Sequence, residues 1–197
     1  MTVTIADIVV SPYYMAQNQM QLEQKYKALL NEAEQRKIPG IEGIQLCFQT
    51  LSLASMIDRD CAIQLAPYGL SEGRFVLLFL LDAAPEGLAP KVLAERAGIT
   101  RATVTGLLDG LERDALIERH ADADDRRALT IRLTQQGKEM AKTVFEHHSR
   151  WIASIFGNLS AQERSQLTVL LGKVASNLIN ECHETSKLNK PHIDIQV

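Results

Sequence analysis

Residues 100–114 are predicted to form a helix with two unlike faces. Its apolar positions have the i, i+3, i+4, i+7 spacing of a buried stripe: Val104, Leu107, Leu108 and Leu111. The outer face carries small and polar side chains: Arg101, Ala102, Thr105 and Asp109. Small side chains let a helix approach a DNA major groove, threonine hydroxyls bond phosphates or base edges, and a guanidinium offers two donors to guanine. This face is suited to reading double-stranded DNA, and an ordinary amphipathic surface helix is the simpler alternative.

A second cluster able to contact DNA lies in the polar segment ADADDRR, residues 121–127. Residues 116–120 and 129–133 flank it, and the second of these alternates apolar and polar side chains as a half-buried strand does. The segment is therefore predicted to be the tip of a β-hairpin. Arginines at such a tip can enter a narrow minor groove, where negative potential is concentrated. A solvated charged loop is the commoner fate of such a run.

The elements that must position these residues are short helices around tight turns. Residues 89–97 and 100–114 are predicted to be two helices separated by Gly98-Ile99, which is the signature of a helix-turn-helix. Ser71 is the predicted N-cap of a preceding helix whose apolar run, residues 75–81, belongs in the core. The predicted fold class is mainly α with a small β-hairpin wing.

Helices are also predicted on both sides of this central segment. A first one, roughly residues 15–37, lies in an N-terminal extension. The next, residues 42–66, is apolar on two faces and must be covered from two sides. After the hairpin, Thr134 caps a helix that runs to about Phe156.

A capping box formed by Ser160 and Glu163 then begins the last predicted helix, which runs to about Thr185. The remaining residues, 186–197, form a polar tail without periodicity. The helix over residues 42–66 and the terminal helices are expected to bury enough apolar surface only if a second copy of the chain covers them.

Composition narrows the class of function. The net charge of −3 excludes a whole-molecule basic field, so DNA contacts must come from local clusters. No basic segment precedes an apolar run and no stretch is long enough to span a bilayer, so a cytoplasmic protein without membrane contact is expected. No nucleophile, phosphate-loop or metal-binding motif is present, so neither an enzyme nor a cofactor or metal site is expected. The dispersed histidines, His147 and His148 among them, are interpreted as surface residues.

Two segments, LSEGRFVLLFLL and LAERAGITRATVTGLLDGLERDALIERHADADDRRALTIRLTQQG, resemble the MarR family of winged-helix repressors. The resemblance covers about residues 70–137 without gaps, with compatible helices on both sides. It implies a winged helix-turn-helix lobe, residues 67–133, and a helical dimerisation lobe formed by residues 41–66 and 134–185, with residues 1–40 as an extension and 186–197 as a tail. It further implies a homodimer that binds a palindromic operator, with two recognition helices in successive major grooves and two wings in the minor grooves.

By matching positions, the resemblance assigns DNA contacts to one set of residues on the recognition helix and one on the wing: Thr100, Arg101, Ala102, Thr103, Thr105, Asp125, Arg126 and Arg127. The chain departs from the family at two positions. Gly106 stands where many members have an arginine. Ala115 stands where the family usually has a glycine with positive φ, a conformation that costs alanine on the order of 1 kcal/mol, so the helix is expected to end differently here.

The resemblance also implies a small-molecule effector, often an aromatic acid, in a cleft between the two lobes. Four residues offer polar or adaptable groups for such a ligand: Ser52, Met56, Arg59 and Arg74. An anionic ligand would use one of the arginines, although Arg59 can equally pair with a neighbouring aspartate. The alternative is a redox-sensing regulator acting through Cys47. Because Leu46 and Phe48 flank this thiol and no basic residue adjoins it, an unreactive buried cysteine is the simpler interpretation.

Overall fold

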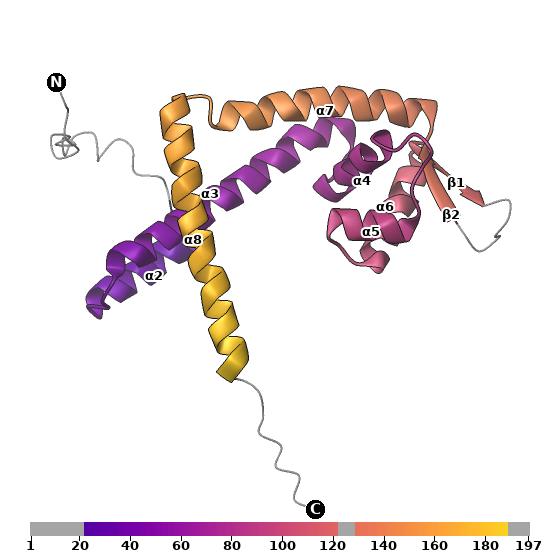
Figure 1. Cartoon of the computed structure of the whole chain (residues 1–197). Coiled ribbons are helices and arrows are strands. Elements are labelled where there is room, and N and C mark those ends of the chain that lie inside the picture. The colour runs from indigo at the N-terminus through magenta and orange to yellow at the C-terminus, as the bar shows by residue number, and fades with distance from the viewer. Residues whose placement is uncertain (1–21, 122–128, 189–197) are drawn as a thin grey trace, which may run out of the picture.

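The computed structural model describes residues 22–121 and 129–188, and gives only the course of the helix for residues 180–188. This part of the chain consists of helices and one hairpin (Figure 1): α2 (Gln24–Gln35), α3 (Ile41–Leu65), the 3-10 turn η2 (Ala66–Tyr68), α4 (Glu72–Asp82), α5 (Pro90–Ala97), α6 (Arg101–Arg113), β1 (Ile117–Ala121), β2 (Leu129–Leu133), α7 (Gln135–Ile155) and α8 (Ala161–Leu188). The predicted fold class, mainly α with a small hairpin, is confirmed.

Side-chain caps begin four of these helices where the sequence predicts them. The hydroxyl of Ser71 accepts from a backbone N–H of α4, and the hydroxyls of Thr100 and Thr134 do the same for α6 and α7. At α8, the backbone N–H of Ser160 donates to Glu163 Oε2 at 2.7 Å and the Glu163 N–H donates back to Ser160 Oγ at 3.3 Å. This reciprocal pair is the predicted capping box.

The hairpin pairs β1 with β2 in an antiparallel register that places Ile117 opposite Leu133 and Ala121 opposite Leu129. Leu88, from the loop before α5, forms an isolated antiparallel β-bridge with Ile131. The first strand starts at Ile117, one residue later than predicted, because Leu116 belongs to the bend that closes α6.

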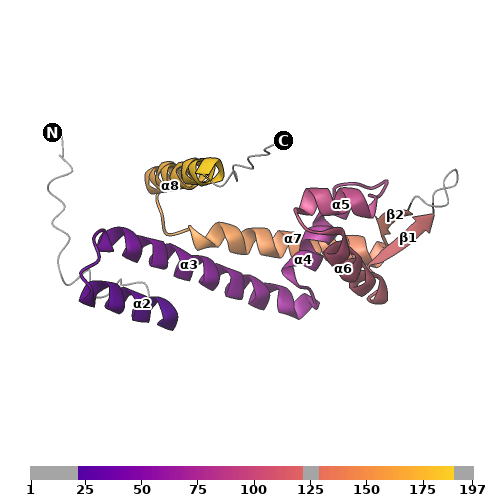
Figure 2. The ribbon, with the colours of Figure 1, turned by 90° about the horizontal axis from the view of Figure 1, so that it is seen from below.

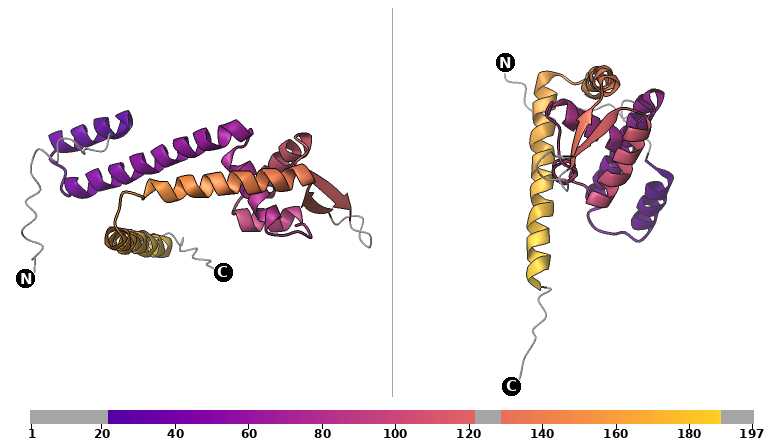
Figure 3. Two further views of the ribbon diagram at one scale, coloured as in Figure 1. Left: turned by 90° about the horizontal axis from the view of Figure 1, so that it is seen from above. Right: turned by 90° about the vertical axis from the view of Figure 1, so that its right-hand side faces the viewer.

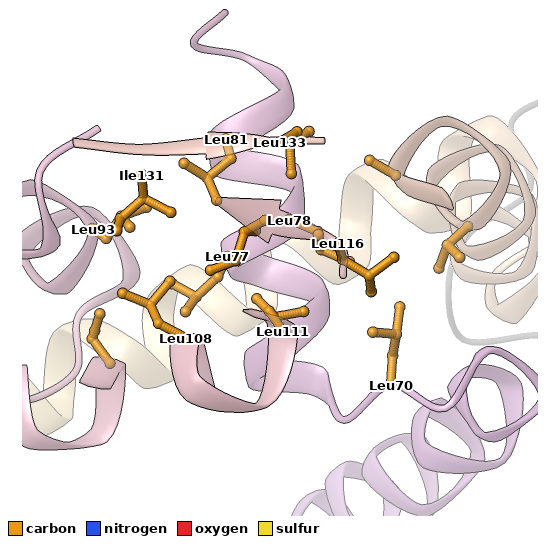
Figure 4. Close-up of a cluster of buried hydrophobic side chains, with 14 of the residues drawn as sticks. Leu70, Leu77, Leu78, Leu81, Leu93, Leu108, Leu111, Leu116, Ile131 and Leu133 are labelled. Carbon is orange, nitrogen blue, oxygen red and sulfur yellow. The ribbon is translucent and has the colours of Figure 1, made fainter. Parts of the chain in front are cut away.

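The hydrophobic core is formed mainly by α4, the helix-turn-helix and the hairpin, and it extends to α3 and α7 (Figure 4). Apolar side chains from α4, α5, α6 and β2 meet there without solvent exposure: Leu77, Leu93, Leu108, Leu111 and Ile131. Val104 is also fully buried, so the predicted inner stripe of α6 is confirmed, with Leu107 half-buried. The core fixes which side of α6 faces outward.

The long helices extend from this lobe. Helix α7 packs against α4, and α3 diverges from α7 toward the opposite end of the molecule (Figure 1). Helix α2 lies alongside α3 (Figure 2). It begins at Gln24, later than the predicted residue 15, and residues 15–21 lie outside the described part of the chain.

Helix α8 turns away from the rest of the chain (Figure 3). Apolar side chains recur along it at three- and four-residue spacing and are largely exposed: Leu170 57%, Leu171 51%, Val174 59% and Leu178 63%. Most of the stability of a helix in a protein comes from packing of its apolar face. In the part of the chain that the structure describes, no helix is long and apolar enough to cross a membrane.

Candidate nucleic-acid interface

The outer face of α6 is exposed at each predicted contact residue. Arg101, Ala102, Thr103 and Thr105 are solvent-accessible, and Thr100 is exposed at the N-cap. Among the described residues, Arg101 forms no ion pair. Its guanidinium, in the first turn of the helix, is available to an anionic partner.

The threonine hydroxyls are already engaged within the helix. Thr100 Oγ1 lies 2.8 Å from Thr103 Oγ1 and accepts from the Thr103 backbone N–H at 3.1 Å. Thr105 Oγ1 donates to the Arg101 carbonyl at 3.0 Å. A hydroxyl that donates to the backbone keeps its lone pairs for a base amino group. Arg101 is thus the main free donor on this face, and the threonines and Ala102 shape the surface around it.

The outer face of α6 has no side chain at position 106, because this residue is glycine. Gly106 is exposed on α6, and a Cβ added there would meet nothing within 4 Å. At this position, where many members of the resembling family carry an arginine, the surface is flat and uncharged.

Arg119 of β1 ties α6 to the hairpin. Its Nη2 contacts a carboxylate oxygen of Asp109, and its Nε lies 3.1 Å from Glu112 Oε2. Asp109 lies on the exposed outer face of α6, as its position in the sequence predicts. The charge of its carboxylate is balanced by Arg119. The pairing joins residues ten positions apart and has no signature in the local pattern.

The expectation that α6 ends differently at Ala115 is wrong, because this residue adopts the positive φ that glycine usually takes at this position. Its φ is +56°, and it follows the last helical residues in a Schellman arrangement: Ala115 N–H donates to Glu112 O and Leu116 N–H donates to Leu111 O, both at 2.9 Å. Helix α6 therefore ends in the geometry that usually employs glycine. The bend directs β1 back along the helix.

The backbone carbonyls of Ala115 and Leu116, in this bend, hold the start of α7. Thr134 N–H donates to Leu116 O at 3.1 Å, and the Thr134 hydroxyl donates to Ala115 O at 2.7 Å. Gly137 packs on the Leu116 carbonyl so closely that an added Cβ would lie 1.9 Å from it. This contact links the end of α6 to the start of α7.

The predicted wing residues, Asp125, Arg126 and Arg127, lie outside the described residues. Strands β1 and β2 end on either side of them, at Ala121 and Leu129. The hairpin predicted to carry them is therefore present, and their role stays a prediction.

The four residues predicted to contact a ligand do not line a single cavity. Met56 and Arg59 line a cavity of about 490 Å³ between α3 and α7, whose other walls are Leu53, Ile57, Asp60, Ile63, Trp151 and Ile155. Ser52 is fully buried and accepts from the Glu23 backbone N–H at 3.2 Å. Arg74 instead ties α4 to the end of α6, donating to Gly69 O at 2.9 Å and pairing with Asp114.

Arg59 pairs with Glu23, and not with a neighbouring aspartate: its Nη1 lies 3.1 Å from Glu23 Oε1. Hydrogen bonding from Ser55, followed by contacts with Lys25 and Arg59, lowers the pKa of Glu23 from 4.5 to about 2. The carboxylate is therefore ionised throughout the physiological range.

The cysteines and histidines differ from their sequence interpretation. Cys47 is exposed, so the prediction of a buried thiol is wrong for the single chain. His148, expected at the surface, is buried, and its Nε2 lies 3.3 Å from the sulfur of buried Cys61. His148 continues the buried stripe of α7 one turn after Val144, which is the signal that the sequence offered. Burial lowers the pKa of His148 and raises that of Cys61, which favours an uncharged thiol and imidazole.

Comparison with known proteins places the chain among transcription regulators of one family. A family model described as the MarR family matches residues 68–128, which include the whole of α6. The HTH-type transcriptional repressor YetL of Bacillus subtilis is 32% identical over 155 residues, covering 78% of this chain and 93% of the repressor.

Solved structures of similar proteins include complexes with DNA. The MepR–DNA complex of S. aureus matches with a TM-score of 0.56 and 27% identity, over 64% of this chain and 92% of that one. The transcriptional repressor CouR bound to a 23-mer DNA duplex matches with a TM-score of 0.55 and 28% identity, over 64% of this chain and 90% of that one.

Proposed function

The chain belongs to the MarR family of transcription regulators, and on that premise we propose that it is a cytoplasmic repressor that binds operator DNA as a homodimer. The observation that carries the proposal is the outer face of α6. Its side chains are short, the core holds it outward, and Arg101 stands unpaired among the described residues. The presence of DNA in the structures of MepR and CouR supports DNA binding by this chain.

The dimer is proposed from the unpartnered apolar surface. Helix α8 presents a stripe of leucine and valine side chains that no other described element covers, and α3 leaves Leu46 and Leu51 exposed. A second copy related by a two-fold axis can cover both. Two copies of α6 then read an inverted repeat in successive major grooves, with half-site centres about 10 base pairs apart.

The wing is proposed to add contacts outside the two major-groove sites. Arg126 and Arg127 follow β1 at the predicted tip of the hairpin, and Asp125 can hold one of them extended by a two-bond pair. Minor-groove arginines read charge and groove width, whereas Arg101 reads a base edge. The two parts of the interface therefore respond differently to a change of sequence.

Substitution at the two parts should separate these roles. Arg101→Ala is expected to relax preference at one base pair of each half-site, at a cost of about 1–3 kcal/mol if the contact to guanine has two bonds. Arg126→Ala and Arg127→Ala should weaken binding to all sequences and reduce the salt dependence by about one charge each. Fluorescence anisotropy with operator variants at several salt concentrations distinguishes the two. Equal losses on every variant for all three substitutions would reject this division.

The effector is proposed to be a small aromatic carboxylate. The cavity between α3 and α7 combines apolar walls with the indole of Trp151 and the guanidinium of Arg59, which together suit a ring bearing an anionic group. Such a ligand regulates the protein only if it binds the DNA-competent and DNA-incompetent dimers with different affinity. Operator release by an aromatic acid, lost in Arg59→Ala, is the supporting result.

A second candidate signal is oxidation of Cys47, which the exposure of its thiol favours. Release of operator DNA by peroxide that disappears in Cys47→Ser, with no response to aromatic acids, would assign the protein to redox sensing. DNA binding through α6 is the same in both cases.

A further inference from the structure

The N-terminal segment is fastened to α3 at buried Ser52 and at Arg59, and Arg59 also lines the cavity proposed for the effector. Glu23 lies just before α2, and its backbone N–H donates to buried Ser52. Its carboxylate reaches Arg59 at 3.1 Å through Oε1 and Lys25 at 3.0 Å through Oε2. One residue of the N-terminal segment thus engages both Ser52 and Arg59, 29 and 36 positions further along the chain.

Arg59 is the one cationic side chain among the residues that line the cavity. The cavity's one carboxylate, Asp60, is already engaged, because Trp151 Nε1 donates to its Oδ2 at 2.6 Å. The charge that an anionic ligand would meet is therefore that of Arg59. In the free protein, that charge is balanced by Glu23.

We propose that Glu23 is a built-in competitor of the effector: an aromatic carboxylate that enters the cavity replaces Glu23 on Arg59 and loosens the start of α2 from α3. This inference rests on the ligand site proposed above and concerns its regulation. It gives the N-terminal helix a role in setting the threshold at which the effector acts.

The ion pair between Glu23 and Arg59 is weak enough for a ligand to replace it. Arg59 is largely exposed, and an exposed ion pair contributes little net stability, so a ligand with ring contacts can displace it. The remainder of α2 is held separately, by the stacking of Tyr26 on Phe48 at 4.9 Å between ring centroids and by burial of Leu30. Glu23 can therefore leave Arg59 without release of the whole helix. Because Glu23 is ionised at any physiological pH, the competition is between two anions and does not vary between pH 6 and 8.

The test uses the full chain and benzoate as the probe. Trp151 is the only tryptophan and lines the cavity, so its fluorescence reports occupancy directly. Glu23→Gln should bind benzoate about fivefold more tightly than the wild type, since the competing charge is gone. Arg59→Gln should lose the response. The control is Glu32→Gln, which breaks an exposed pair with Arg36 on the same helix and should leave benzoate affinity unchanged.

Hydrogen exchange gives a second measurement. Benzoate should increase amide exchange in residues 24–27 of the wild type and have no such effect on Glu23→Gln. Equal benzoate affinity in the wild type and Glu23→Gln overturns the proposal. The absence of any change in Trp151 fluorescence in both proteins also overturns it, and this is the outcome expected if a second copy of the chain fills the cavity. Operator binding without benzoate, measured on the same samples, tests the regulator proposal independently.

Discussion

Gly137→Ala should destabilise the protein by about 3 kcal/mol, near the upper end of what overpacking costs. The added Cβ would stand 1.9 Å from the Leu116 carbonyl oxygen, and this neighbour is backbone and cannot rotate away. The carbonyl is fixed in addition by the Thr134 N–H, so relief requires α7 to move off the bend that closes α6. Denaturant unfolding at a fixed protein concentration measures the loss, and operator affinity should fall with it.

Two substitutions act as controls for this junction. Gly106→Ala adds the same methyl group in open space within α6 and should stabilise the helix by about 0.5–1 kcal/mol. Ala115→Gly relieves the positive φ on the other side of the Leu116 carbonyl and should stabilise the fold by up to about 1 kcal/mol. A stability of Gly137→Ala equal to that of Gly106→Ala would show that α7 does not rest on this carbonyl.

Placing two charges in the stripe of α8 should separate the dimer. The double substitution Leu171→Glu, Val174→Glu puts unpaired carboxylates into the surface proposed to pack against a second copy. Burying such charges costs several kcal/mol, so operator affinity should fall at least about a hundredfold, which corresponds to about 2.8 kcal/mol. Sedimentation velocity should give the mass of one chain at a concentration where the wild type has twice that mass.

The matched control adds the same charge to the opposite side of the helix. Ser165→Glu, Ser176→Glu lies about half a turn away from the stripe and should keep both the dimer and operator binding. If both double variants remained dimers with wild-type affinity for DNA, α8 would not be the dimer contact.

Features encoded by neighbouring residues were predictable. The caps at Ser71, Thr100 and Thr134 and the box at Ser160 act within three positions, so each is visible as a short pattern. The inner stripe of α6 follows the helical period, and the core confirms it.

Features formed between distant residues were not predictable from such patterns. The partners Glu23 and Arg59 are 36 positions apart, and any of several carboxylates could have taken that place. Arg74 is a ligand candidate because it offers a charged group on a segment expected to line the pocket, yet the fold brings Asp114 to it from 40 positions away. Cys61 and His148 meet only because α3 and α7 converge near α4.

The central claim is that α6 of each copy reads one half of a symmetric operator. The most direct measurement is hydroxyl-radical protection on duplexes selected from a random pool by the full-length protein. The account predicts an inverted repeat with half-site centres about 10 base pairs apart, and protection across both major grooves that Arg101→Ala weakens. Selected sequences without a dyad, or binding that never exceeds the affinity for unselected DNA at moderate salt, would contradict it.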